Sequence, residues 1–104
     1  MGVDEQTITK ITASIKTLVN PKRIILFGSH AKGDADQDSD IDLLVVDDSG
    51  RDKNSVALEI SRALFPRGYG LDLFVESPGD LERKSGYDFW REVLTTGRVL
   101  YERE

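Results

Sequence analysis

The chain has 104 residues, 38% of them hydrophobic and 32% charged, so we expect one small domain with one core over residues 1–104. It contains no cysteine and one histidine, which excludes disulfides, thiolate zinc sites, cysteine nucleophiles and multi-histidine metal sites. A net charge of −5 argues against direct binding of duplex nucleic acid, which needs clustered Lys and Arg. The apolar runs are too short to span a membrane and the N-terminus lacks a signal segment, so we expect a cytoplasmic protein.

Helix and strand patterns alternate along the chain. Apolar residues at helical spacing predict a helix over residues 4–19, ended by Asn20-Pro21, and a second over about residues 54–65. Short apolar runs predict strands over residues 23–27, 41–46 and 71–75. Ser77-Pro78 is typical of a helix start, Gly97 should stop a last helix, and residues 98–101 predict a short edge strand. This alternation indicates an α/β layer fold around one sheet.

The stretch GSHAKGDADQDSDID, from Gly28 to Asp42, carries aspartates at positions 34, 36, 38, 40 and 42. An EF-hand calcium loop needs a glycine at its sixth position, and no register that begins at Asp34, Asp36 or Asp38 supplies one. A phosphate-binding P-loop would need Lys and Ser or Thr after Gly33, where the chain has Asp-Ala. Both of these common sites are therefore excluded.

A different arrangement remains: Gly28-Ser29 after a strand, ten residues, then Asp40-x-Asp42 at the start of the next strand. Residues i and i+2 of a strand share a face, about 6.6–6.8 Å apart, so both carboxylates can approach a divalent cation such as Mg²⁺. Gly28 lets a triphosphate approach the backbone, and Ser29 offers a hydroxyl and an N–H at the start of a predicted helical turn. Lys32 is a candidate counter-charge for the phosphates.

This pattern strongly resembles the motif of the nucleotidyltransferase superfamily related to DNA polymerase beta, and the whole chain resembles its minimal nucleotidyltransferase family. The resemblance implies a small mixed sheet flanked by helices, and a reaction that uses ATP and two Mg²⁺ ions. It further implies two sets of site residues. The catalytic and metal-binding set would be Asp40, Asp42 and Asp72, and the nucleotide-binding set Gly28, Ser29 and Lys32.

Asp72 is included in the catalytic set because enzymes of this superfamily use a third carboxylate on a later strand. Leu71 and Leu73 flank it, so an ionised Asp72 is unfavourable unless it is paired or metal-bound. A helix between the second and third predicted strands favours parallel pairing, which would bring Asp72 to the same end of the sheet as Asp40 and Asp42. The alternatives are a salt bridge from Asp72 to a neighbour such as Arg67, and a merely solvated strand start at Asp40 and Asp42.

Other polar and aromatic residues are assigned less directly. We expect Asp34, Asp36 and Asp38 to be solvated loop acids. His30 and Lys32 stand where related sequences often carry arginine, which weakens any bidentate phosphate contact. For Glu76 we expect an exposed strand end rather than a role behind Asp72. For the aromatic residues Tyr87, Phe89 and Trp90 we expect core or interface packing rather than a surface on which a base stacks.

The resemblance implies Mg²⁺-dependent transfer of AMP from ATP to a hydroxyl acceptor. Because minimal nucleotidyltransferases are typically paired with a HEPN-domain toxin, the expected acceptor is a tyrosine of such a partner, with this chain as its antitoxin. One alternative is a catalytically weak nucleotide-binding antitoxin that inhibits its partner by occlusion. Another is an antibiotic nucleotidyltransferase, but those enzymes carry an additional helical domain for which this chain has no residues to spare.

Overall fold

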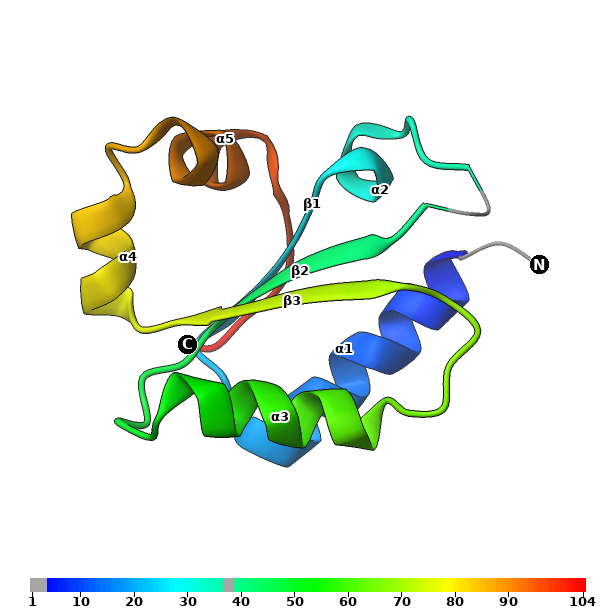
Figure 1. Ribbon diagram of the computed structural model, residues 1–104, viewed down its shortest axis with the longest axis horizontal. Coiled ribbons are helices and arrows are strands. Elements are labelled where there is room, and N and C mark those ends of the chain that lie inside the picture. The colour runs from blue at the N-terminus through cyan, green and yellow to red at the C-terminus, as the bar shows by residue number, and fades with distance from the viewer. Residues whose placement is uncertain (1–3, 37–38) are drawn as a thin grey trace.

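The computed structural model describes residues 4–36 and 39–104. One four-stranded sheet, in the order β3-β2-β1-β4, separates α1 and α3 on one face from α4 and α5 on the other (Figure 1). The elements follow the predicted order: α1 (Glu5–Val19), β1 (Arg23–Phe27), α2 (Ser29–Lys32), β2 (Ile41–Val46), α3 (Lys53–Ala63), β3 (Leu71–Glu76), α4 (Pro78–Lys84), α5 (Asp88–Thr96) and β4 (Arg98–Glu102). The predicted small mixed sheet flanked by helices is confirmed.

The helix α1 forms where the apolar spacing predicts it. Asp4 caps its start by accepting a hydrogen bond from the Thr7 amide at 2.9 Å, and Asn20, in the left-handed conformation at φ 47°, ends it. The buried side chains of α1, at positions 8, 11 and 15, pack on the sheet together with Val56 and Ile60 of α3. Burial of each such side chain contributes about 1.5–3 kcal/mol, which fixes this helical layer against the sheet.

Alternate residues of the strands face opposite layers. Leu43 and Val45 of β2 belong to the core under α1 and α3, whereas Leu44 and Val46 pack with Trp90 and the rest of the α4–α5 layer. Asp42 shares the second face with Leu44 and Val46. The side chain of Asp42 is thereby directed to the face of the sheet that carries α5.

The strand pairings position the ends of β2 and β3 together. β1 lies antiparallel to both β2 and β4, and β4 forms the predicted edge strand. β2 and β3 are parallel, as the helical crossover predicted, with α3 forming the connection. Within the described ranges, no helix has the length and apolar character needed to cross a membrane.

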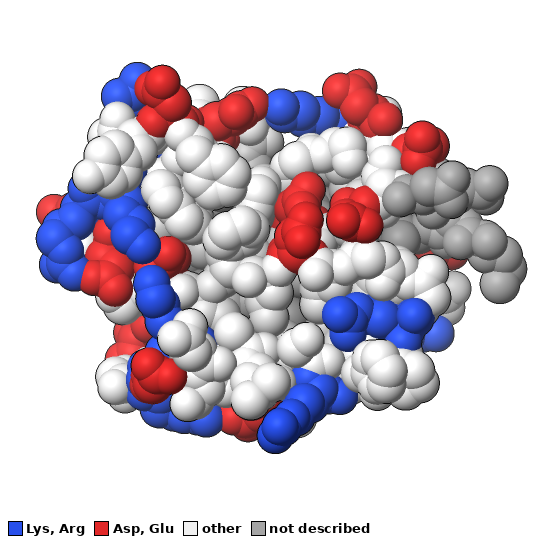
Figure 2. All heavy atoms as spheres, in the orientation of Figure 1, with Lys and Arg blue, Asp and Glu red and all other residues white. Residues whose placement is uncertain are grey.

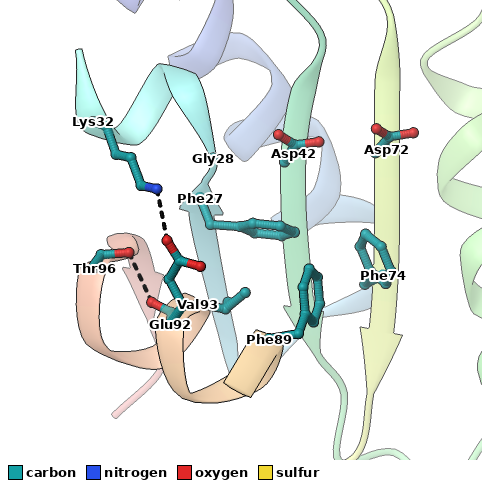
Figure 3. Close-up of a pocket in the computed structure, with 10 residues that line it drawn as sticks. All are labelled: Phe27, Gly28, Lys32, Asp42, Asp72, Phe74, Phe89, Glu92, Val93 and Thr96. Carbon is teal, nitrogen blue, oxygen red and sulfur yellow. Dashed lines mark hydrogen bonds and ion pairs between the residues drawn. The ribbon is translucent and has the colours of Figure 1, made fainter. Parts of the chain in front are cut away.

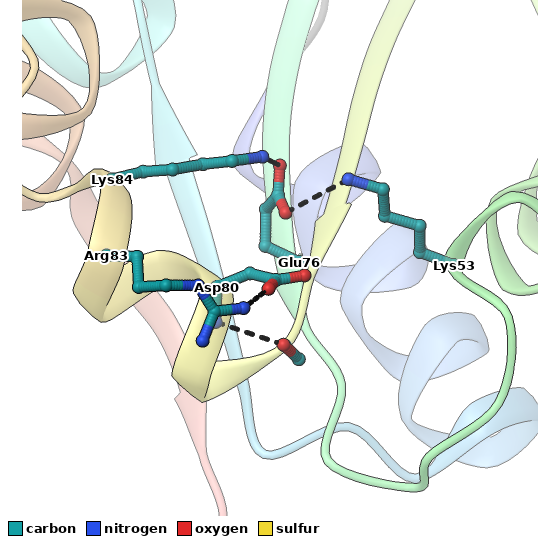
Figure 4. A network of polar contacts seen from close by, with 6 residues as sticks. Lys53, Glu76, Asp80, Arg83 and Lys84 are labelled. Atoms are coloured by element: carbon teal, nitrogen blue, oxygen red, sulfur yellow. Dashed lines mark hydrogen bonds and ion pairs between the residues drawn. The ribbon is translucent and has the colours of Figure 1, made fainter.

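Glu76, at the far end of β3, corrects one prediction from the sequence. Its side chain is buried rather than exposed, with 5% relative exposure. Lys84 of α4 donates to its carboxylate at 2.8 Å and Lys53 of α3 at 3.3 Å, so that Glu76 joins the helices on the two faces of the sheet (Figure 4). A buried carboxylate needs such partners, and removing one of them leaves an uncompensated charge. Glu76 is therefore a structural residue.

Candidate active site

Two carboxylates stand side by side at the start of neighbouring strands. Asp42 of β2 and Asp72 of β3 are register partners in the parallel pair, and both side chains line one cavity of about 300 Å³ (Figure 3). Asp40 lies just before β2, and its carboxylate rests against the backbone of Gly70, where an added Cβ would lie 1.9 Å from Oδ1. Figure 2 shows acidic side chains gathered near the middle of this face, with uncharged surface around them.

The protonation of Asp42 reflects this crowding. Burial, the hydrogen bond with Asp72, and the negative charges of Asp72 and Asp40 together raise its pKa to about 6, while the positive charge of His30 opposes the shift. Among the described residues, none of the three carboxylates takes part in an ion pair. Arg67, the alternative partner for Asp72, donates instead to the Ser61 carbonyl at 3.4 Å.

This donor set is suited to Mg²⁺. Hard carboxylate oxygens are the protein ligands that Mg²⁺ prefers, and a cation would relieve the repulsion that raises the Asp42 pKa. No three acidic or histidine side chains of the described residues form a preassembled metal cluster. Mg²⁺ normally takes only one or two carboxylates and completes its shell with water and substrate phosphates, so the site fits an ion that arrives with a nucleotide.

Gly28 brings the backbone between β1 and α2 directly against Asp42. Its φ of 74° is a conformation that glycine adopts readily, and an added Cβ would lie only 2.1 Å from Oδ2 of Asp42. The Gly28 carbonyl accepts hydrogen bonds from the amides of Ala31 and Lys32, which fold the following residues into the predicted helical turn. Ser29 is therefore the first residue of α2, two residues beyond the end of β1.

Lys32 lines the same cavity but is already paired. Its ammonium donates to the Glu92 carboxylate of α5 at 2.8 Å, an interaction that raises the pKa of Lys32 and lowers that of Glu92. Both side chains remain substantially exposed, so the pair is solvated and weak. No pattern in the sequence points to Glu92, which lies sixty residues away and meets Lys32 only through the fold.

The loop before β2 is held by local hydrogen bonds. His30 donates from Nε2 to the Ser39 carbonyl at 3.1 Å, which ties α2 to the residue just before Asp40. Asp36 accepts from the Ser39 hydroxyl at 3.2 Å. Asp34 and Asp36 are exposed, as predicted, whereas Asp38 lies outside the described residues.

Aromatic rings form the apolar side of the cavity. Phe27, Phe74 and Phe89 line it below the two carboxylates (Figure 3). Phe89, for which core or interface packing was predicted, does not lie in the core, since 47% of it is exposed, whereas Trp90 behind it is buried; interface packing of Phe89 stays a prediction. Tyr87 is also exposed, at 68%. Strand alternation could have placed Phe74 beside Asp72, because the two are separated by one residue.

The fold is shared with nucleotidyltransferases. A family model described as nucleotidyltransferase domain matches residues 8–102, and the chain belongs to that family, which is polymerase-beta-like. The recognition made from Gly28-Ser29 and Asp40-x-Asp42 is thereby confirmed, as is the prediction of a nucleotidyltransferase enzyme.

Two relatives come from Methanocaldococcus jannaschii. The "Putative protein adenylyltransferase MJ0604" is 37% identical over 100 residues, which cover 94% of this chain and 98% of the relative. The "Putative protein adenylyltransferase MJ1305" is 34% identical over 87 residues, which cover 78% of this chain and 58% of that protein.

Solved structures share the fold. The crystal structure of a "putative nucleotidyltransferase from Sulfolobus solfataricus" superposes with a TM-score of 0.64 at 23% identity, covering 92% of this chain and 78% of the other. A crystal structure of a toxin–antitoxin with AMP-PNP gives a TM-score of 0.61 at 25% identity, covering 92% and 74%. A toxin–antitoxin MntA-HpeT structure gives 0.58 at 25% identity, covering 98% and 75%.

Proposed function

We propose that this chain transfers AMP from ATP to a hydroxyl group on a protein, with Mg²⁺ as cofactor, and that Asp40, Asp42 and Asp72 carry the reaction. The observation that supports this most strongly is the contact between the candidate phosphate-binding backbone and the candidate metal-binding carboxylates. The backbone of Gly28, in the candidate phosphate loop Gly28-Ser29, lies directly against the carboxylate of Asp42, which in turn lies beside Asp72.

The role proposed for each residue follows from where it lies in the site. Asp40 and Asp42 would hold the ion that accompanies the triphosphate, and Asp72 would share a second ion on the β3 side. Bound Mg²⁺ would neutralise the negative charge that develops on the phosphates. Gly28 leaves room for the phosphates at the backbone, and Ser29 and Lys32 supply a hydroxyl and a positive charge for the leaving group.

The transfer itself is a single displacement. The acceptor oxygen forms a bond to the α-phosphorus, while the bond breaks between that phosphorus and the oxygen that bridges the α- and β-phosphates. Pyrophosphate leaves with the bonding electron pair. The acceptor proton passes to the carboxylate of Asp72, which is exposed at the start of the edge strand β3 and open to an incoming hydroxyl.

The nature of the acceptor is inferred from the relatives and from charge. The relatives named as protein adenylyltransferases support a protein acceptor, and the toxin–antitoxin neighbours support a toxin as that protein. We infer that the acceptor is a tyrosine of a HEPN-domain toxin, silenced by the added AMP. A net charge of −5 favours a partner with a basic face, as expected of an RNA-cleaving protein.

Inhibition by occlusion is the second candidate. The ion pair between Lys32 and Glu92 favours it, because this pair occupies the one cationic side chain that lines the described part of the cavity. In that case the chain would silence its partner by binding alone, without transferring AMP.

Intact-mass spectrometry separates the two candidates. When the chain, a HEPN-domain partner, ATP and Mg²⁺ are mixed, the partner should gain one or more AMP masses and lose its nuclease activity. The Asp40→Asn/Asp42→Asn variant should leave the partner unmodified and active. If that variant inhibits an unmodified partner as well as the natural chain does, occlusion is the function.

A further inference from the structure

The cavity beside the carboxylates has an aromatic wall that the phosphate chemistry does not use. The rings of Phe27, Phe74 and Phe89 form a triangle with centroid separations of 5.7, 5.9 and 5.7 Å. Phe27, next to the phosphate loop, is 7% exposed, whereas Phe74 and Phe89 are 36% and 47% exposed. The open rings therefore lie on the side of β3 and α5 (Figure 3).

Packing alone does not account for the position of Phe89. The helix α5 is already held on the sheet by the buried side chains of Trp90 and Val93, so the fold has little need of a third apolar contact there. Single exposed aromatic rings are ordinary on protein surfaces. Two exposed rings that converge in a cavity, with a candidate catalytic carboxylate at its edge, form a shaped surface for a ligand.

The spacing to Asp72 identifies which part of a ligand would reach these rings. Asp72 and Phe74 are residues i and i+2 of β3, so they share a face and are separated by about 6.6–6.8 Å along the strand. A flat ring placed against Phe74 and Phe89 would direct a substituent toward Asp72 if that substituent lies at the ring edge nearest the start of β3. A phenol has its single polar group at that position.

We propose that Phe74 and Phe89 form the subsite for the aromatic ring of the acceptor side chain, a tyrosine phenol; this rests on the proposed function. Because β3 is an edge strand, a folded protein can present a side chain from its open side. Ring-on-ring contact holds the phenol, and its hydroxyl meets Asp72, the group that takes its proton.

The nucleotide base fits this wall less well than a phenol. A base carries several donors and acceptors on its edges, which need partners when they are buried. Beside the rings, the Thr96 hydroxyl already donates to the Glu92 carbonyl at 2.8 Å, and the Glu92 carboxylate is paired with Lys32. The phosphate loop also lies on the β1 side, separated from β3 by β2.

Trp90 supplies a reporter for the test. It is the only tryptophan in the chain, and its ring lies 5.0 Å from that of Phe89 and 5.8 Å from that of Phe74. Its fluorescence, excited where tyrosine does not absorb, should change as N-acetyltyrosinamide is titrated in, and N-acetylserinamide should produce no such change. The affinity for ATP with Mg²⁺ is measured on the same samples by calorimetry.

The variants separate acceptor binding from nucleotide binding. Phe89→Leu keeps an apolar side chain at an exposed position and should fold; Phe74→Ala removes the second ring. Each should weaken binding of N-acetyltyrosinamide about tenfold while leaving the affinity for ATP with Mg²⁺ unchanged. Tyr87→Ala, which removes an exposed ring outside the cavity lining, should change neither affinity.

Each other result overturns the proposal. If N-acetyltyrosinamide does not bind, or binds no better than N-acetylserinamide, the wall has no acceptor role. If the two phenylalanine variants bind it normally, the rings are packing only. If they lose affinity for ATP, alone or together with N-acetyltyrosinamide, the rings serve the nucleotide. If the natural chain does not bind ATP with Mg²⁺, the proposed function is refuted. Binding of a phenol to the two rings is then judged by the titration with N-acetyltyrosinamide alone.

Discussion

Replacing Asp40 and Asp42 together with asparagine is expected to lower the rate of AMP transfer by about three orders of magnitude or more. Asparagine keeps the size of each side chain but removes the charge that would hold Mg²⁺ beside the triphosphate. The loss of several kcal/mol of charge stabilisation in the transition state accounts for an effect of this size. The rate is measured as the growth of the AMP-modified mass of the acceptor protein over time.

The matched control removes two charges from the same stretch of sequence. Asp34 and Asp36 are exposed and are not among the residues that line the cavity, so Asp34→Asn/Asp36→Asn should retain nearly full activity. If this control loses as much activity as the first double variant, the division of the acidic stretch into binding and solvated aspartates is wrong.

The double variant at positions 40 and 42 should also be more stable than the natural chain when no metal is present. The Asp42 pKa is about 6 in the folded protein against a reference value of 3.8, so the folded state holds this proton more tightly than the unfolded state. The resulting stabilisation is complete below about pH 4 and is lost as the pH rises through about 6. In EDTA, the Tm advantage of the variant should therefore grow between about pH 4 and pH 7, and a pH-independent difference would contradict this account.

Gly28→Ala should disrupt the site strongly, because the added methyl group would overlap the Asp42 carboxylate. The new Cβ would lie 2.1 Å from Oδ2 and 3.1 Å from Cγ of Asp42, and the residue must also keep a φ of 74°. With ψ at −154°, this backbone conformation is one that essentially only glycine adopts; it costs another residue about 1–3 kcal/mol, and displacement of the Asp42 carboxylate adds to it. We expect a lower Tm and loss of nucleotide binding, measured by thermal melting and calorimetry.

Gly33→Ala separates backbone strain from steric overlap. Gly33 has a similar φ of 79°, but an added Cβ there would meet nothing within 4 Å. Gly33 lies in the left-handed helical region, with ψ at 11°, so alanine there should cost about 1–2 kcal/mol of backbone stability while the affinity for ATP with Mg²⁺ is kept. Equal loss of nucleotide affinity in both variants would mean that the contact between Gly28 and Asp42 has no special role.

The sequence predicts the order of the elements well, because local patterns determine most of them. The cap at Asp4, the stop at Asn20 and the start at Ser77 are each set by neighbours within a few residues. Parallel pairing of β2 with β3 was also predictable, since a helix connects them. That pairing is what brings Asp72 beside Asp42.

Contacts between distant elements could not be predicted in the same way. Glu76 looked like an exposed strand end, but Lys53 and Lys84 from helices on opposite faces of the sheet enclose it. Phe89 fits the apolar stripe of α5 as well as Trp90 does, and only the orientation of the helix leaves Phe89 at the cavity. Both outcomes depend on how helices sit on the sheet, which a single sequence does not encode locally.

Calorimetric titration of ATP into the protein, with Mg²⁺ and then with EDTA, tests the central claim most directly. The three carboxylates would repel a triphosphate unless a cation lies between them, so binding should be strong with Mg²⁺ and undetectable in EDTA. The Asp40→Asn/Asp42→Asn variant should lose the Mg²⁺-dependent binding. Equal affinity of the natural chain for ATP in Mg²⁺ and in EDTA would contradict a metal-bridged nucleotide site.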